Sequence, residues 1–146
     1  MNLVNKTLIM LMIAFTSVNT FAGECRKYTN EQKDVIEKAY AYGKNFGYGE
    51  TLAAIVVRES FVGNRIIRYN PSDPSTGITH IYFPTLKHLS GMNHWDAMLE
   101  AESLITDDFK SFDYSIQKLN SVRAKTLWSK WKGYNGSAEY ANHIQG

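Results

Sequence analysis

One carboxylate in this sequence is placed for acid–base chemistry. Glu59 follows Arg58, and both come directly after the apolar run Leu52–Val57. If that run forms a buried helix, burial and the negative end of the helix dipole both favour the protonated form of the Glu59 side chain. A carboxylic acid that keeps its proton near neutral pH is what a general acid requires. Arg58 favours the opposite interpretation, in which Glu59 is an ionised helix-end carboxylate held in a salt bridge.

Helix signals precede this carboxylate. The segment Thr29–Gln32 has the form of a capping box, in which the threonine and glutamine side chains bond reciprocally to the backbone. Apolar residues then recur every three or four positions as far as Phe46, which predicts an amphipathic helix. The segment Glu50–Ser60 is so apolar that its period fits a buried strand as well as a buried helix. Its length, its alanines and the acidic residue at its start favour the helix.

An irregular segment follows Glu59. All three prolines fall within residues 71–84, among asparagine, serine, aspartate and glycine, and predict a non-helical stretch over Gly63–Phe83. Within this stretch, Ile78–Tyr82 could form a short strand. A long irregular loop inside a compact helical domain is uncommon unless it serves a site.

Helical patterns return at Pro84 and continue to the end of the chain. The sequence predicts a helix that starts at Asn93, helices over Asp107–Leu119 and Ser121–Trp131, and a short last helix capped by Ser137. Four residues are expected on the inner face of the helix that starts at Asn93: Trp95, Met98, Leu99 and Ile105. Since no internal repeat or linker interrupts the pattern, we expect one mainly α-helical domain.

The N-terminus has the features of an export signal. Residues Met1–Ala22 combine a short polar start, an uncharged and mostly apolar stretch, and small residues before the expected cleavage point. The apolar stretch is shorter than the roughly 20 residues of a membrane span. An uncleaved N-terminal anchor is the alternative, whereas Glu24 before Cys25 disfavours a lipoprotein signal. We therefore expect an exported protein, periplasmic or secreted, whose functional domain is residues 23–146.

Composition excludes several functional classes. The 146 residues carry 16 Lys and Arg against 14 Asp and Glu, and this net charge of +2 argues against a strongly basic nucleic-acid binder. Cys25 is the only cysteine, so neither an internal disulfide nor a cysteine-based metal site is expected. The four histidines have no persuasive ligand spacing, and we expect no metal and no cofactor.

Three blocks of sequence occur in a fixed order. The first is the Glu-Ser step Glu59–Ser60 at an expected helix end, the second is Ser75–Ile81, and the third is Trp131–Ser137, which contains Tyr-Asn-Gly and is followed by Tyr140. Together they resemble the three motifs of lytic transglycosylases of the soluble-transglycosylase (SLT) type. In the second block the family has a Gly-Leu-Met-Gln-Ile-like segment, and here threonine and His80 replace its methionine and glutamine.

The resemblance implies a goose-type-lysozyme-like α+β fold, mainly helical, with a small irregular or short-stranded region between helices. It implies that the partner is peptidoglycan, cut between N-acetylmuramic acid and N-acetylglucosamine to leave a 1,6-anhydro ring. Glu59 would act first as general acid and then as general base. Ser75, His80 and Asn135 would line the substrate groove with Tyr134, which would help to position the carboxyl group or the substrate's acetamido group. Ser60 would join this substrate-binding set by supporting the helix end.

Most glycosidases use two carboxylates. The candidates for a second one are Asp73, Asp107, Asp108 and Asp113. The first is interpreted as a turn-forming residue and the others as solvent-facing charges. The lack of a clear partner for Glu59 agrees with the substrate-assisted scheme of the family.

Other interpretations stay open. Tyr134 fits equally well as a core aromatic residue. A hydrolytic muramidase and a catalytically silent cell-wall-binding module are the alternative functions. Remodelling for a secretion or other envelope-spanning apparatus, cell growth and phage lysis all use this chemistry, and the sequence does not choose among them.

Overall fold

The computed structural model describes residues 28–68 and 70–145, and the predicted export signal and Cys25 lie outside them. The chain divides into two compact units, Met1–Lys33 and Asp34–Gly146. The described part of the first unit contains the start of helix α2 (Asn30–Lys44), where the predicted capping box is confirmed. The backbone N–H of Thr29 donates to the Gln32 side chain at 2.9 Å, and that of Gln32 donates to the Thr29 hydroxyl at 3.2 Å.

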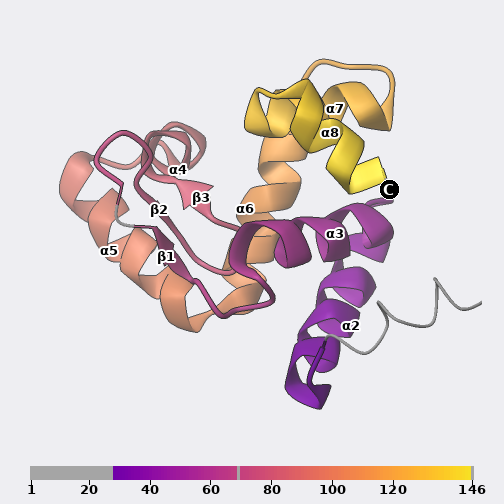
Figure 1. Ribbon diagram of the computed structural model, residues 1–146. Helices are drawn as coiled ribbons and strands as arrows, with labels where there is room; N and C mark the ends of the chain where they lie inside the picture. The colour runs from indigo at the N-terminus through magenta and orange to yellow at the C-terminus, as the bar shows by residue number, and fades with distance from the viewer. Residues whose placement is uncertain (1–27, 69, 146) are drawn as a thin grey trace, which may run out of the picture. The chain divides into compact units, whose positions relative to one another are not determined.

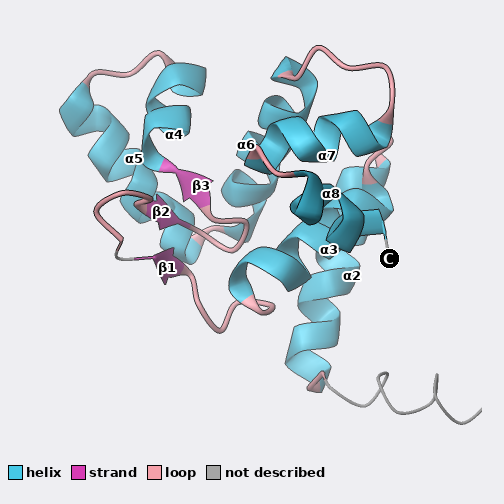
Figure 2. Cartoon of the chain, turned by 45° about the horizontal axis from the view of Figure 1, so that its top comes forward, coloured by secondary structure: helices cyan, strands magenta, loops and turns pink. Residues whose placement is uncertain are grey.

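The second unit is mainly helical, which confirms the predicted class (Figures 1 and 2). After α2 its elements are α3 (Gly49–Ser60), β1 (Ile67–Arg68), β2 (Ser75–Thr76), β3 (Ile81–Tyr82), α4 (Phe83–Ser90), α5 (His94–Thr106), α6 (Asp108–Ser121), α7 (Leu127–Asn135) and α8 (Ala138–Gln145). The strands form one antiparallel sheet in the order β1-β2-β3. The buried helix predicted over residues 50–60 is therefore confirmed as α3.

The irregular segment lies where the sequence predicts it, but Ile78–Tyr82 is not one strand. Only β3 at its end pairs, with β2, and the residues before β3 form a turn. His80 in this turn has a φ of 48°, which is incompatible with an extended backbone. The turn starts at Gly77, whose φ is 81° and where an added Cβ would lie 2.2 Å from the Ser111 hydroxyl oxygen. Glycine at this position lets the turn lie close against α6.

The expected inner face of α5 is wrong. Trp95, Met98 and Leu99 are 73%, 48% and 67% exposed, whereas the buried residues of α5 are Ala97, Ala101 and Leu104. Either set fits one face of a helix, so periodicity did not separate them, and Ile105 of the expected set is half-buried. The alanine face lets α4 and α6 pack closely against α5.

The helix predicted over residues 121–131 starts later than expected. α6 continues to Ser121, and α7 begins only after Thr126, whose side chain accepts from the Ser129 N–H at 3.2 Å. Between the two helices the Lys130 ammonium donates to the carbonyls of Leu119 and Val122 at 2.9 and 3.1 Å. These bonds satisfy acceptors that a continuous helix would have satisfied internally.

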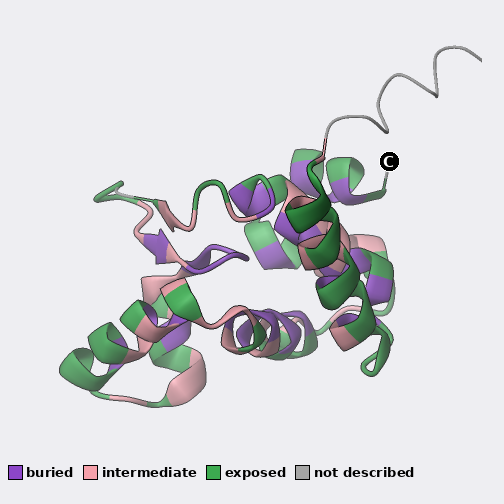
Figure 3. Cartoon of the chain, turned by 90° about the horizontal axis from the view of Figure 1, so that it is seen from below, coloured by how far each residue is buried: buried purple, intermediate pink, exposed green. Residues whose placement is uncertain are grey.

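The core of the second unit surrounds α6, which packs against α3, α4, α5, α7 and β3 (Figure 1). Figure 3 shows the buried residues on the inner faces of the helices and strands. The largest fully buried apolar side chains are Phe112, Leu52, Ile55, Ile81, Leu86, Leu104, Leu119 and Val56. No helix within residues 28–68 and 70–145 is long and apolar enough to cross a membrane.

Candidate active site

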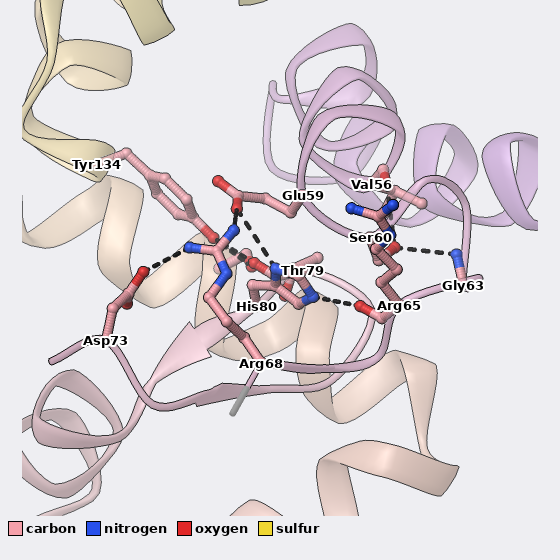
Figure 4. Close-up of polar contacts among 11 residues, drawn as sticks. Val56, Glu59, Ser60, Gly63, Arg65, Arg68, Asp73, Thr79, His80 and Tyr134 are labelled. Atoms are coloured by element: carbon pink, nitrogen blue, oxygen red, sulfur yellow. Dashed lines mark hydrogen bonds and ion pairs between the residues drawn. The ribbon is translucent and has the colours of Figure 1, made fainter. Parts of the chain in front are cut away.

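Helix α3 ends in a left-handed turn that places Glu59. Phe61 and Val62 have φ values of 53° and 57°, and Gly63 follows with 84°. The Ser60 hydroxyl donates to the Val56 carbonyl at 3.2 Å and accepts from the Gly63 N–H at 2.9 Å (Figure 4). Ser60 thus ties the turn to the helix.

Glu59 is 9% exposed and contacts two basic side chains (Figure 4). Its Oε2 lies 3.8 Å from Nη2 of Arg68 and 3.7 Å from Nδ1 of His80. Arg68 also pairs with Asp73. The salt bridge that Arg58 suggested in the sequence is made instead by Arg68, since no ion pair among the described residues joins Arg58 to Glu59.

His80 is held from the opposite side of its ring. Its Nε2 hydrogen-bonds the backbone carbonyl of Arg65. Because a carbonyl oxygen only accepts, this nitrogen carries a hydrogen. The Nδ1 atom, on the side facing Glu59, is buried and has no hydrogen-bond partner among the described residues.

Two adjoining cavities meet at Glu59. Both are lined by Glu59, Arg68, His80 and Asn135. The first, here called the arginine cavity, has a volume of about 480 Å³ and is also lined by Arg58, Phe61, Arg65, Ile67, Ser137, Glu139 and Tyr140. The second, here called the serine cavity, has a volume of about 560 Å³ and is also lined by Ser72, Asp73, Ser75, Tyr82, Thr85, Lys118, Gly133, Tyr134 and Gly136.

The structure brings most of the predicted site residues to these cavities. Ser75 is 2% exposed on β2 and lines the serine cavity, where its hydroxyl has no partner in the described chain. Asn135 ends α7 and lines both cavities. Ser60 lines neither, and its contacts are those of a residue that supports the helix end.

Tyr134 lies beside Glu59, but its hydroxyl group is hydrogen-bonded to other residues of the protein (Figure 4). The hydroxyl accepts a hydrogen bond from the Ser115 hydroxyl at 3.0 Å and donates one to the Thr79 carbonyl at 3.4 Å. Burial raises the pKa of Tyr134, and the nearby Glu59 carboxylate raises it further. Its contacts match the core-aromatic alternative, at a place that also borders the serine cavity.

Tyr140 and Lys118 complete the surroundings. The ring of Tyr140 stacks on Tyr134 with centroids 6.1 Å apart, and its buried hydroxyl has no partner in the described chain. Burial and then the Glu59 charge raise the pKa of Tyr140. The Lys118 ammonium lies 4.3 Å from the centre of the Tyr134 ring, and burial lowers its pKa although Glu59 and Asp73 oppose the shift.

Sequence reasoning missed several of these neighbours. Arg65, Arg68 and Lys118 belong to none of the three blocks, and only the fold brings them to Glu59. Tyr140 carried a signal because it follows the third block.

None of the other candidate carboxylates is free beside Glu59. Asp73 lines the serine cavity but pairs with Arg68. Asp107 caps α6, and Asp113 accepts from Tyr42 and Gln117; neither lines a cavity, nor does Asp108. Within the described residues no group of three His, Cys, Asp or Glu side chains could hold a metal ion.

Comparisons with known proteins give no match: no family model, no curated protein and no solved structure matches this chain.

Proposed function

We propose that this protein is a peptidoglycan lytic transglycosylase with a lysozyme-like fold. It cleaves the β-1,4 bond between N-acetylmuramic acid and N-acetylglucosamine without adding water. The observation that carries the proposal is the position of Glu59, a nearly buried carboxylate that borders two adjoining cavities. A glycan strand that occupies both cavities would have a glycosidic bond above this carboxylate.

Glu59 serves as the single acid and base in this reaction. It first gives its proton to the leaving glycosidic oxygen, while the substrate's acetamido oxygen bonds to the anomeric carbon. The Glu59 carboxylate then takes the proton of the sugar 6-hydroxyl, whose oxygen attacks the same carbon and displaces the acetamido oxygen. The attack is intramolecular, so it has an entropic advantage over attack by water.

The surroundings of Glu59 fit this scheme. The cation of Arg68, 3.8 Å away, stabilises the carboxylate that exists between the two proton transfers. Asp73 is bound to Arg68, so this carboxylate is not free to act as nucleophile or to activate water. Asn135, which lines both cavities, supplies an amide to hold the sugars, and Ser75 forms part of the wall of the serine cavity.

The direct test is product analysis. Purified protein is incubated with peptidoglycan sacculi, and the released fragments are identified by mass spectrometry. We expect fragments that end in 1,6-anhydro-N-acetylmuramic acid. Reducing ends alone would instead identify a hydrolytic muramidase, and binding to sacculi without any release would identify a binding module.

The place of action follows from the predicted export signal. An exported enzyme of this kind meets the cell wall outside the cytoplasm, and remodelling of the wall for an envelope-spanning apparatus is one role that such cleavage serves.

A further inference from the structure

His80 is held in an uncommon conformation beside the proposed acid. Its φ of 48° is left-handed, which is uncommon for residues other than glycine, although asparagine, aspartate and histidine adopt it more often than the rest. Its side chain is only 3% exposed. The turn that imposes this backbone lies between Gly77 and β3, and the ring borders both cavities. The fold therefore fixes the ring beside Glu59 with little freedom to turn away.

The hydrogen bond on the far side of the ring determines what His80 offers to Glu59. Since Nε2 carries a hydrogen for the Arg65 carbonyl, the neutral ring has its lone pair on Nδ1. That atom is 3.7 Å from Oε2 of Glu59 and has no other partner in the described chain. A protonated Glu59 has an O–H to donate, and Nδ1 is an acceptor placed next to it.

The cationic neighbours cannot take this role. Arg58, Arg65, Arg68 and Lys118 border the cavities from α3, the loop after it, β1 and α6, and their charged groups only donate hydrogen bonds. Asp73 is bound to Arg68, and Glu139 lines the arginine cavity without an ion pair to His80. Tyr82, Tyr134 and Tyr140 also border the cavities, and their hydroxyl groups can accept a hydrogen bond but, unlike an imidazole, do not take up a proton.

We propose that His80 is a positioning residue that shares one proton with Glu59. The pair holds one proton between Oε2 of Glu59 and Nδ1 of His80, and the acid step uses the form in which the carboxyl group carries it and neutral His80 faces it as acceptor. A second proton on the pair removes the acceptor, and loss of the shared proton removes the acid. This inference rests on the proposed function for its kinetic consequence, but the shared proton itself is a property of the free protein.

The kinetic test uses His80→Gln, which keeps a hydrogen-bonding side chain but cannot titrate. We expect wild-type kcat/KM to fall on both the acidic and the alkaline side of its optimum. The variant keeps activity within about tenfold at the optimum and loses only the acidic limb, because one titrating group remains. A merely structural role predicts an equal loss at every pH with both limbs kept, and that result would overturn the proposal.

A second test does not require catalysis. The titration of His80 is followed by NMR of the imidazole ring in the wild type and in Glu59→Gln. The Glu59 charge favours protonated His80, so we expect the variant to move the His80 midpoint to lower pH. The exposed His88 and His143 serve as internal controls whose midpoints stay unchanged. An unmoved His80 midpoint would overturn the shared proton even if the protein proves to be a transglycosylase, and a moved midpoint would support it even if no product forms.

Discussion

The arginine cavity and the serine cavity share Glu59 but differ in charge. On the arginine side, Arg58 and Arg65 form no ion pair among the described residues. On the serine side, Asp73 pairs with Arg68, and burial lowers the pKa of Lys118. Apart from the residues that both cavities share, the arginine side has Arg58 and Arg65 against Glu139, whereas the serine side has Lys118 against Asp73, so the arginine side is the more positive of the two. The difference suggests that the carboxylates of a peptide-substituted sugar bind on the arginine side and neutral sugar on the serine side.

The largest expected effect concerns the residue that both cavities share. Glu59→Gln keeps the shape of the side chain but cannot donate a proton, so we expect cleavage of sacculi to fall by about 10³-fold or more while binding persists. The matched control is Glu102→Gln, which changes an exposed carboxylate of α5 that lines neither cavity and is expected to retain activity. Turnover by the Glu59 variant at the wild-type rate would remove the proposed chemistry.

A second prediction tests the charge difference directly. In the double variant Arg58→Gln, Arg65→Gln we expect KM for peptide-bearing glycan to rise about tenfold, because two cationic contacts are lost. Peptide-free glycan is expected to be cleaved as before. Arg123→Gln, an exposed change in the segment between α6 and α7, serves as the control. An equal rise in KM for both substrates would contradict the assignment of charge to one side.

The stacked tyrosines provide a smaller test, in stability. Tyr134→Phe removes hydroxyl contacts to Ser115 and Thr79, so we expect the free energy of unfolding to fall by about 1–2 kcal/mol. Tyr140→Phe removes a buried hydroxyl without a partner, and we expect no loss or a small gain. Urea denaturation of both variants makes the comparison, and equal losses would show that Tyr140 has a partner after all.

The smallest expected effect is the pH dependence that Lys118 imposes. Because burial lowers its pKa in the folded state, the unfolded chain binds more protons between that lowered value and the ordinary 10.5. Stability therefore rises with pH across this interval, up to the point near pH 10 where tyrosines begin to ionise. We expect Lys118→Met to flatten the slope of the unfolding free energy between pH 7 and pH 9.5. A slope unchanged by the substitution would show that Lys118 is solvated in the native state.

Local signals in the sequence predicted the elements that the chain builds from neighbouring residues. The capping box at Thr29, the buried helix that ends at Ser60 and the cap at Asn93 each depend on side chains a few positions apart, and all are confirmed. The turn around His80 was only partly foreseen, because a left-handed histidine has no sequence signature comparable to glycine.

The features that the sequence did not predict share a physical cause. Each depends on packing between residues that are far apart along the chain. The sequence predicts Trp95 and its large apolar neighbours on the buried face of α5 because they are the most hydrophobic residues there. The close packing of α4 and α6 against α5 instead favours the small side chains of Ala97 and Ala101 on that face. The contact of Arg68 with Glu59 joins an edge strand to a helix end through the tertiary fold. No spacing along the chain encodes such a pair.

The left-handed turn after α3 has one further consequence. Phe61 is 60% exposed at the rim of the arginine cavity, in a conformation that costs a non-glycine residue about 1–3 kcal/mol. Glycine at this position would remove the backbone strain and so stabilise the folded state. It would also remove an aromatic ring on which a sugar ring could stack. Folding stability and ligand affinity therefore favour different residues at this position.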